Sequence, residues 1–503
     1  MTAVFSSPVV SMSDLNASSS SVHVAVIGGG VAGATAALHL AERGIKVSLI
    51  EQGGGLVNGP PICHLHAGGN LYPDISEQQC LDLLQQSIES VRLYRHTLNI
   101  RPTVIAVPHS DPTQPDALLP RLATIAQHYR DLVEQDEANR VLGDPDTYYR
   151  VYDKASLLSL RAQTQPETPT SFDEWMIPFA QHVDLEQLKF PVIMVNEFGW
   201  SVFRLAATAM LAFEQMPHCS VMLNTRLEHA EYNGQVWQLR CHNQQGEIVQ
   251  LNADYLVNAC GYETGKLDDR AGFQRDRWVE FKAAYVTEWA DCQQQWPEVV
   301  VHGPRGTEHG MAQLTPYADH VFQLHGMTES ITLFSDGLVH STPESSQPTL
   351  PATLQQKIDS GWSNQASDAR SCRAIEHIAQ FIPVYTQAIP HGKPLYGAQQ
   401  IPGEDATLRA ADVTFEAQHY ARLEIVKGSS ALEAARKLVQ HWALVPEEKQ
   451  TSNDAESASI ERQHPISMAL SADEVEQRAI ALAVQRGYPT ALAKRMGEIP
   501  PTF

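Results

Sequence analysis

The feature that most constrains the fold is a glycine-rich turn within VHVAVIGGGVAGATAALHLAERGIKVSLIEQ at residues 22–52. A short apolar segment precedes the turn, small and apolar residues at helical spacing follow it, and a second apolar segment ends at an acidic residue. This order predicts a strand, a tight turn, a helix and a second strand. The glycines match G-x-G-x-x-G, which in this setting indicates a dinucleotide site on a Rossmann-like sheet. A Rossmann-like unit without a ligand is the alternative.

The three glycines have separate physical tasks at such a site. Gly28 allows the tight turn, Gly30 lets the backbone approach a pyrophosphate because it has no Cβ, and Gly33 lets the helix pack closely on the sheet. The phosphates then lie at the helix N-terminus, where free N–H groups and the helix dipole favour negative charge. We expect Val31 and Ala32, which open this helix, to bind the cofactor together with the glycines.

The acidic residue after the second strand narrows the choice of dinucleotide. Glu51 follows Gly28 by 23 residues, close to the spacing of about 20 at which a carboxylate accepts a hydrogen bond from a ribose hydroxyl. A carboxylate at this place repels a 2′-phosphate, which disfavours NADP. We expect Gln52, next along the chain, to lie at the same part of the site.

Composition and charge exclude several classes of protein. The 503 residues are enough for two or three domains, and the formal net charge of −22 disfavours non-specific binding of nucleic acid. The seven cysteines form no C-x-x-C pair, which favours a reducing compartment, and we expect a cytoplasmic protein. No apolar run approaches the length of a transmembrane helix. Residues 1–21 are rich in serine, lack the pattern of a signal peptide, and are expected to form a disordered arm.

A long Gly/Pro-rich segment, 53–73, follows the predicted ribose contact. It is too long for a simple connector and is expected to run beside the cofactor. The segment contains His64 and His66. Cys63 with these two histidines also resembles a set of metal ligands, but there is no distant second pair, and we expect no metal site.

Two further regions show the alternation of apolar and polar residues that is typical of strands. Residues 220–224, 227–232, 236–241 and 248–251 predict a four-stranded β-meander, which leads into a buried strand ending at Gly261. Residues 279–288 and 321–338 predict strands of a second sheet. Near the other end of the chain a short strand, 423–426, meets a turn of small residues and a helix, 431–441.

These features together resemble the glycerol-3-phosphate dehydrogenase/D-amino-acid oxidase superfamily of FAD enzymes, over most of residues 22–440. The resemblance implies FAD as the cofactor, and a Rossmann-like FAD-binding domain interleaved with an α+β substrate domain built on an antiparallel sheet. It places Gly261 where a cofactor backbone comes close. It also implies that a late turn faces the flavin ring, formed here by Lys427, Gly428, Ser429, Ser430 and Ala431.

The same resemblance implies a division of the chain. We expect the FAD-binding domain to comprise 22–100, 197–265 and 394–445, and the substrate domain to comprise 101–196 and 266–393. Residues 446–503 are expected to form a polar linker and C-terminal helices.

The segment from His64 to Tyr72 is similar to a histidine-containing loop of the 2-hydroxyglutarate oxidase and malate:quinone oxidoreductase branches. It is also similar to the loop of dimethylglycine and sarcosine dehydrogenases, whose histidine can attach covalently to the flavin. Oxidation at a C–H bond needs a base for the hydroxyl or amine proton, and histidine suits this near neutral pH. His66 and His64 are therefore candidates for this base. The alternative is a histidine that binds only loop backbone.

A small acid substrate also needs a cation, and arginine offers a two-pronged contact to a carboxylate. The candidates are Arg305, Arg373 and Arg409, with an exposed surface arginine as the alternative for each. His325 and Gln323, two apart on one strand, share a face that points into the pocket or into the core. The resemblance places Lys427 near the flavin ring, and the alternative is a lysine at a helix N-terminus that points to solvent. Lys282 and Tyr285 begin a predicted strand of the second sheet.

The sequence therefore predicts an FAD-dependent oxidoreductase that transfers hydride from a small 2-hydroxy acid to flavin N5. Electrons then pass to oxygen, a quinone or a carrier. The oxidation of an amino acid or secondary amine is a closely related hypothesis. A flavoprotein module without activity of its own, or one that acts only with a partner protein, is a hypothesis of a different class. An NAD-dependent enzyme with the same glycine fingerprint is the fourth hypothesis.

Overall fold

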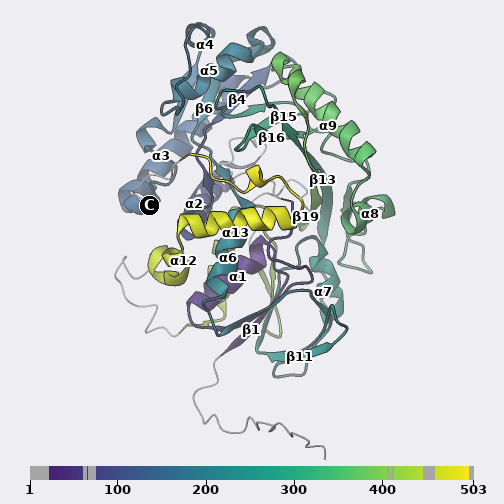
Figure 1. Ribbon diagram of the computed structural model, residues 1–503. Coiled ribbons are helices and arrows are strands. Elements are labelled where there is room, and N and C mark those ends of the chain that lie inside the picture. Colours follow the sequence, from purple (N-terminus) through teal and green to yellow (C-terminus); the bar gives the residue numbers. More distant parts are fainter. Residues whose placement is uncertain are drawn as a thin grey trace, which may run out of the picture.

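The computed structural model describes residues 22–60, 65, 75–404, 408, 413–445 and 459–497. Two large sheets, joined by segments that pass repeatedly from one to the other, organise these residues (Figure 1). The predicted arm 1–21 lies outside the described residues. So do most of the Gly/Pro-rich segment, with His64, His66 and Tyr72, and Arg409.

The smaller sheet contains the glycine turn. Its strands, in order across the sheet, are β20 (Val413–Glu416), β21 (Tyr420–Leu423), β12 (Tyr255–Asn258), β1 (His23–Ile27), β2 (Lys46–Ile50) and β8 (Cys219–Met222). All neighbours are parallel except β20 and β21. The predicted Rossmann-like unit of β1, α1 (Val31–Glu42) and β2 is confirmed.

Both faces of the smaller sheet are covered, as the uninterrupted apolar sequence of its strands requires. Val24 and Val26 of β1 pack in one core with α1. Ala25 and Ile27 point to the opposite face and pack against a three-stranded antiparallel sheet. That sheet consists of β9 (Thr225–Tyr232), β10 (Trp237–Asn243) and β11 (Ile248–Ala253).

The meander prediction is wrong in its first strand. Residues 219–222 form β8, which pairs in parallel with β2 instead of joining β9. Strands at a sheet edge and in a hairpin share the same alternating pattern, so pattern alone does not choose the partner. The prediction of a strand over 321–338 is wrong in its second half, because β16 ends at Gly326 and the chain turns before β17.

The larger sheet is mostly antiparallel. Its order is β17 (Leu338–His340), β13 (Arg277–Glu288), β16 (Val321–Gly326), β15 (Ala312–Pro316), β14 (Glu298–Val301), β4 (Thr103–Pro108), β6 (Leu188–Val195) and β5 (Tyr149–Tyr152). Two further strands, β18 (Ile389–Pro390) and β19 (Leu395–Pro402), also pair with β13. β19 therefore lies in the larger sheet, although we predicted 394–445 as part of the FAD-binding domain; the division as a whole stays a prediction.

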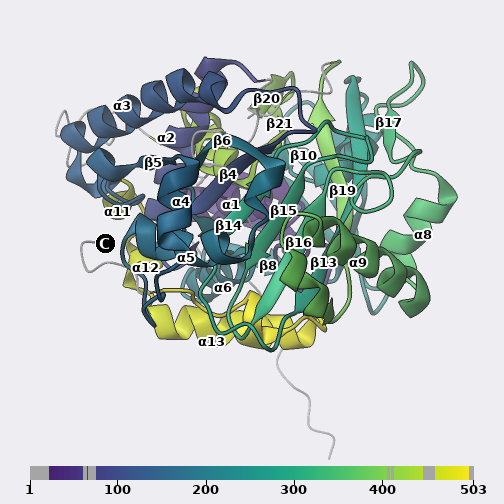
Figure 2. The same cartoon turned by 90° about the horizontal axis from the view of Figure 1, so that it is seen from above.

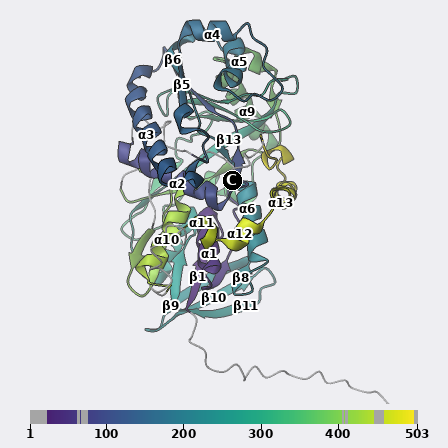
Figure 3. The ribbon, with the colours of Figure 1, turned by 90° about the vertical axis from the view of Figure 1, so that its left-hand side faces the viewer.

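Helices pack against both sheets. α4 (Lys154–Leu160), α5 (Phe172–His182) and α9 (Asn364–Ala379) share a core with the larger sheet. The other helices are α2 (Glu77–Leu93), α3 (Leu119–Gln135), α6 (Val202–Phe213), α7 (Thr264–Ala271), α8 (Ala352–Ser360), α10 (Ala431–His441), α11 (Ile460–Gln463), α12 (Pro465–Ala469) and α13 (Ala472–Gln485). Figure 3 shows α10, α11 and α12 gathered beside α1. No helix in the described part of the chain combines the length and apolarity needed to cross a bilayer.

Candidate functional site

Two cavities meet at the glycine turn. Cavity A, of about 300 Å³, lies at the carboxyl ends of β1, β2 and β12. In a parallel sheet this edge is where ligands bind. Of the residues predicted to bind the cofactor, Gly28, Gly30, Glu51, Gln52 and Gly261 line it.

The structure separates the tasks of the three fingerprint glycines. A Cβ on Gly28 would lie 2.4 Å from the carbonyl oxygen of Ala259, and a Cβ on Gly33 would lie 1.8 Å from that of Gly28. These two positions must be glycine so that the strands and α1 can pack. A Cβ on Gly30 would meet no atom within 4 Å. The space beside Gly30 therefore belongs to the cavity, which is what the predicted approach of a pyrophosphate requires.

Glu51 has a structural task in addition to the predicted one. Its Oε2 accepts a hydrogen bond from the Gly29 amide (2.6 Å), and its Oε1 accepts one from the Gly53 amide (2.6 Å). Asn58 Nδ2 also donates to Oε1 (3.4 Å). A carboxylate has about four lone-pair positions, so these three bonds leave room for a ribose hydroxyl. The contact between Glu51 and ribose stays a prediction.

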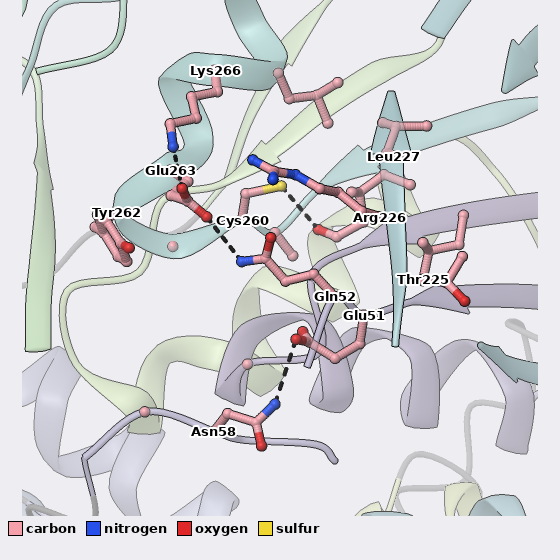
Figure 4. Close-up of a pocket in the computed structure, with 18 of the residues that line it drawn as sticks. Glu51, Gln52, Asn58, Thr225, Arg226, Leu227, Cys260, Tyr262, Glu263 and Lys266 are labelled. Atoms are coloured by element: carbon pink, nitrogen blue, oxygen red, sulfur yellow. Dashed lines mark hydrogen bonds and ion pairs between the residues drawn. The ribbon is translucent and has the colours of Figure 1, made fainter. Parts of the chain in front are cut away.

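The opposite wall of cavity A is polar, as Figure 4 shows. Gln52 Nε2 donates to Glu263 Oε2 (3.0 Å), and Glu263 also forms an ion pair with Lys266. Arg226 and Tyr262 complete this wall. Gly261, at a φ of +59°, starts the turn that brings Tyr262 and Glu263 to the cavity.

Cavity B, of about 350 Å³, lies between the glycine turn and the larger sheet. It shares Gly30, Gly59 and Ala398 with cavity A, so the two cavities adjoin. The polar residues of its larger-sheet wall are Lys282 on β13, Gln313 on β15, His325 on β16 and Gln399 on β19. Val31, Trp200, Lys427 and Gly428 line it from the side of the smaller sheet.

The late turn faces cavity B with its first two residues only. Lys427 and Gly428 line the cavity, and a Cβ on Gly428 would lie 2.7 Å from the Trp200 ring. Ser429 and Ser430 are buried against α2, through a bond from Ser90 Oγ to the Ser429 carbonyl and one from Ser430 Oγ to Gln86. Ala431 begins α10 and is buried, and Ala32 of the glycine turn lines neither cavity.

Only some of the predicted catalytic residues lie at a cavity. His325 lines cavity B. Arg305 lines neither cavity: its side chain is 44% exposed and pairs with Glu280. Glu280 is buried and also binds Lys282, with 2.7 Å between Oε2 and Nζ, so Arg305 and Lys282 share one carboxylate. His64, His66 and Arg409 lie outside the described residues.

The remaining candidates have structural partners. Arg373 donates to the carbonyl of Ser330. Gln323 is fully buried and accepts from the hydroxyl of Tyr317 (3.2 Å). The buried Tyr285 hydroxyl donates to the carbonyl of Ile331 (2.8 Å).

Sequence reasoning missed several residues at cavity B. Trp200 is one of them. Its indole Nε1 is buried and has no hydrogen-bond partner in the part of the chain that the structure describes. Gln313 and Gln399 carried no signal, because a single glutamine in an alternating strand is typical of any half-buried sheet.

Glu197 is another residue that the sequence did not single out. Its carboxyl is buried, and neither oxygen has a hydrogen-bond partner among the described residues. Burial and the nearby charge of Glu298 raise the pKa of Glu197 to about 8, against the opposing effect of Lys427. Glu197 is therefore mostly neutral at pH 7 and does not cancel the charge of Lys427.

The residues present fit FAD. An open space at Gly30, a helix N-terminus at Val31 and a carboxylate at Glu51 suit a pyrophosphate and a ribose. Cavity B, which adjoins cavity A, offers an indole N–H and a lysine for a polar ring. Among the described residues, no group of three or more His, Cys, Asp or Glu side chains could hold a metal ion.

The comparisons with known proteins agree with this fit. The DAO family model, described as FAD dependent oxidoreductase, matches residues 23–384. Glycine oxidase from Geobacillus kaustophilus is 15% identical with a TM-score of 0.51, over 85% of this chain and 95% of that one. L-amino acid deaminase from Proteus vulgaris is 12% identical with a TM-score of 0.53, over 85% and 95%. A search of curated proteins found no match.

A third solved structure, glycerol-3-phosphate dehydrogenase from Bacillus halodurans, is complexed with FAD. It is 12% identical with a TM-score of 0.51, over 94% of this chain and 81% of that one. At such identities these structures show a shared fold.

Proposed function

Because this chain belongs to the DAO family of FAD-dependent oxidoreductases, we propose that it dehydrogenates a small 2-hydroxy acid in cavity B. Its cofactor is FAD, in keeping with the FAD-bound structure of the same fold. Gly28, Gly30 and the start of α1 would hold the pyrophosphate. Lys427 and Gly428 would lie toward the flavin ring.

The positive charge of cavity B is the observation that carries the proposal. Lys282, on the larger sheet, and Lys427, on the late turn, both line this cavity. Glu280 pairs with both Lys282 and Arg305, so the two cations share its single negative charge. The described residues that line cavity B include no aspartate or glutamate, and the buried Glu197 near Lys427 is mostly protonated at pH 7. A cavity that two lysines line, with no carboxylate among its described lining residues, favours a substrate that carries a small carboxylate.

The protein's own side chains orient the substrate and move its proton. A lysine ammonium binds the substrate carboxylate, and the apolar side chains of Met311 and Met327 limit water in the same cavity. His325, on the cavity wall, takes the hydroxyl proton at one ring nitrogen as the C–H bond breaks. Bound FAD supplies a hydride acceptor at flavin N5. His66 and His64 remain candidate bases, and electrons then pass to oxygen, a quinone or a carrier.

A second candidate function is the oxidation of an amino acid or secondary amine. The names of three solved structures of this fold support it: glycine oxidase, iminodiacetate oxidase and L-amino acid deaminase. Cavity B suits such substrates as well, since they also carry a carboxylate. The two candidates differ in the group that loses its proton, a hydroxyl or an amine.

Anaerobic reduction of the bound flavin separates these candidates. The holoenzyme is mixed in the absence of oxygen with a panel of 2-hydroxy acids, and in parallel with the amino and imino acids of the same carbon skeletons. We expect a 2-hydroxy acid to bleach the flavin absorbance at the highest rate. Bleaching by amino or imino acids and by no 2-hydroxy acid would overturn the primary proposal in favour of the second. The methyl esters of the active acids are the matched control, and should react slowly because they lack the carboxylate.

A further inference from the structure

The C-terminal helices pack beside the cofactor-binding sheet, although they lie beyond the residues that match the family model. α13 packs along α6, and the two helices lie side by side in Figures 1 and 2. Directly after α13 the chain turns through Arg486, Gly487, Tyr488 and Pro489, which we call the Arg486 turn. This turn reaches loop 53–60, which contributes lining residues to both cavities.

Arg486 holds two consecutive carbonyl groups of that loop. Its NH2 group donates to the carbonyl of Leu56 (2.6 Å), and its NH1 group donates to the carbonyl of Val57 (2.7 Å). Both loop residues are buried. Burial of the guanidinium lowers the pKa of Arg486, with smaller opposing effects of Tyr488 and Glu51. A desolvated cation at this place is compensated by its two carbonyl contacts.

The backbone held by Arg486 is in an unfavourable conformation. Val57 has a φ of +53°, in the left-handed region that β-branched residues rarely adopt. Its amide donates to the carbonyl of Gly29 (2.7 Å), within the glycine turn. Hydrogen bonds on both sides of Val57 hold this conformation: its amide binds Gly29, and its carbonyl binds Arg486.

The loop held in this way forms walls of both cavities. Asn58 and Gly59 line cavity A, and Val57, Gly59 and Pro60 line cavity B. A displacement of Val57 would shift these walls away from the cofactor.

The other end of the Arg486 turn contacts the larger sheet. The ring of Tyr488 packs edge-on against Phe203 of α6, and the ammonium of Lys393 lies 4.1 Å from the Tyr488 ring centre. Pro489 packs against Gly392, just before β19. The turn thus connects the loop at the glycine turn with the strand that carries Ala398 and Gln399 into cavity B.

We propose that Arg486 is a positioning residue for the cofactor, through which the C-terminal helices retain FAD. It keeps loop 53–60 in the conformation that closes cavities A and B around the ligand. This inference rests on the binding of FAD alone and is independent of which substrate is oxidised.

The test compares the retention of FAD in variants of the full chain. R486Q removes the two-pronged contact and should raise the dissociation constant for FAD, and the rate of flavin release on dilution, by about tenfold or more. R478Q is the matched control: Arg478 lies on α13 too, but pairs with the exposed Glu214, and should bind FAD like the wild type. Flavin fluorescence measures both quantities without substrate.

A second substitution separates positioning from general loss of structure. V57G removes the conformational strain at Val57, because glycine adopts a positive φ easily. In the R486Q background V57G should recover most of the affinity for FAD. The inference is overturned if R486Q binds FAD like R478Q, or if V57G recovers nothing. If the wild type binds FAD but no acid bleaches it, the proposed substrate is wrong and this inference stands.

Discussion

Glu197 is the residue through which pH should control cavity B. With its pKa raised to about 8, the carboxyl is protonated at pH 7 and becomes negative above pH 8. Its charge then opposes that of Lys427, which lines the cavity. Because few water molecules separate buried groups, a new negative charge here weakens the binding of an anionic substrate.

We therefore predict that the KM for the acid substrate rises about three- to tenfold as the pH increases through 8. E197Q keeps the size and the neutral state of the side chain, and should remove this rise while leaving KM at pH 7 nearly unchanged. E137Q, which changes an exposed carboxyl, should behave like the wild type. Steady-state kinetics from pH 6.5 to 9 measures the effect. A rise of equal size in E197Q would contradict the assignment.

The residues of the site differ in how far the sequence could predict them. Gly28 and Gly33 are recognisable from spacing because the packing they allow is local to one strand, turn and helix. Glu197 and Trp200 are not recognisable, since their burial at cavity B results from contacts between segments far apart in the chain. Glu51 was predicted as a cofactor contact, but its bonds to Gly29 and Gly53 depend on a loop shape that the spacing does not contain.

Among the helices and strands too, those set by local sequence were predictable and those set by distant contacts were not. α1 was predicted from the small and apolar residues that follow the glycine turn, and most of its residues are buried. The partner of β8 could not be predicted, because its alternating pattern suits the free edge of β2 as well as a hairpin. β19 pairs with β13 and so belongs to the larger sheet, although it lies in the range 394–445 that was predicted for the FAD-binding domain.

A buried pair of histidines attaches the C-terminal helices to α1. His464 Nδ1 lies 2.7 Å from the carbonyl of Ile460, which it reaches as a donor, so its Nε2 accepts from His39 Nδ1 (2.9 Å). This arrangement needs a neutral His464 ring, because its Nε2 must accept. Burial lowers the pKa of His464 to about 4 and that of His39 well below its usual value, and Arg43 and Arg436 lower both further. The carbonyl of Ile460 and, less strongly, Glu461 oppose the shift at His464.

The pair should make the stability of the protein depend on pH. Since the folded pKa is below the unfolded value of about 6.5, the stabilisation is complete above pH 6.5 and is lost as the pH falls toward 4. For His464 alone this loss is roughly 3 kcal/mol of unfolding free energy. Denaturant unfolding at pH 7 and pH 4.5 should show a smaller loss in H39Q/H464Q than in the wild type. H229Q, at an exposed position, should lose as much unfolding free energy between pH 7 and pH 4.5 as the wild type. An equal loss in all three proteins would refute the prediction.

At the scale of the whole molecule, the site is assembled from distant segments. The glycine turn near residue 30 and the late turn near residue 428 face the same cavity, and strands β13, β15, β16 and β19 form the opposite wall. Only the resemblance to a known superfamily allowed the two turns to be placed together from the sequence. Its extension to a histidine loop stays a prediction, because that loop lies outside the described residues.

The central claim is that FAD occupies the space beside Gly30, and the visible absorption spectrum tests it most directly. Gly30 has a φ of −66°, which alanine adopts freely, and its Cβ position is open within the protein. G30A should therefore fold with the melting temperature of the wild-type apoprotein, yet fill the space that the pyrophosphate needs. Both proteins are incubated with FAD and freed of unbound ligand. We predict a flavin spectrum for the wild type and a weak or absent one for G30A; a colourless wild type, or an equally yellow G30A, would contradict the account.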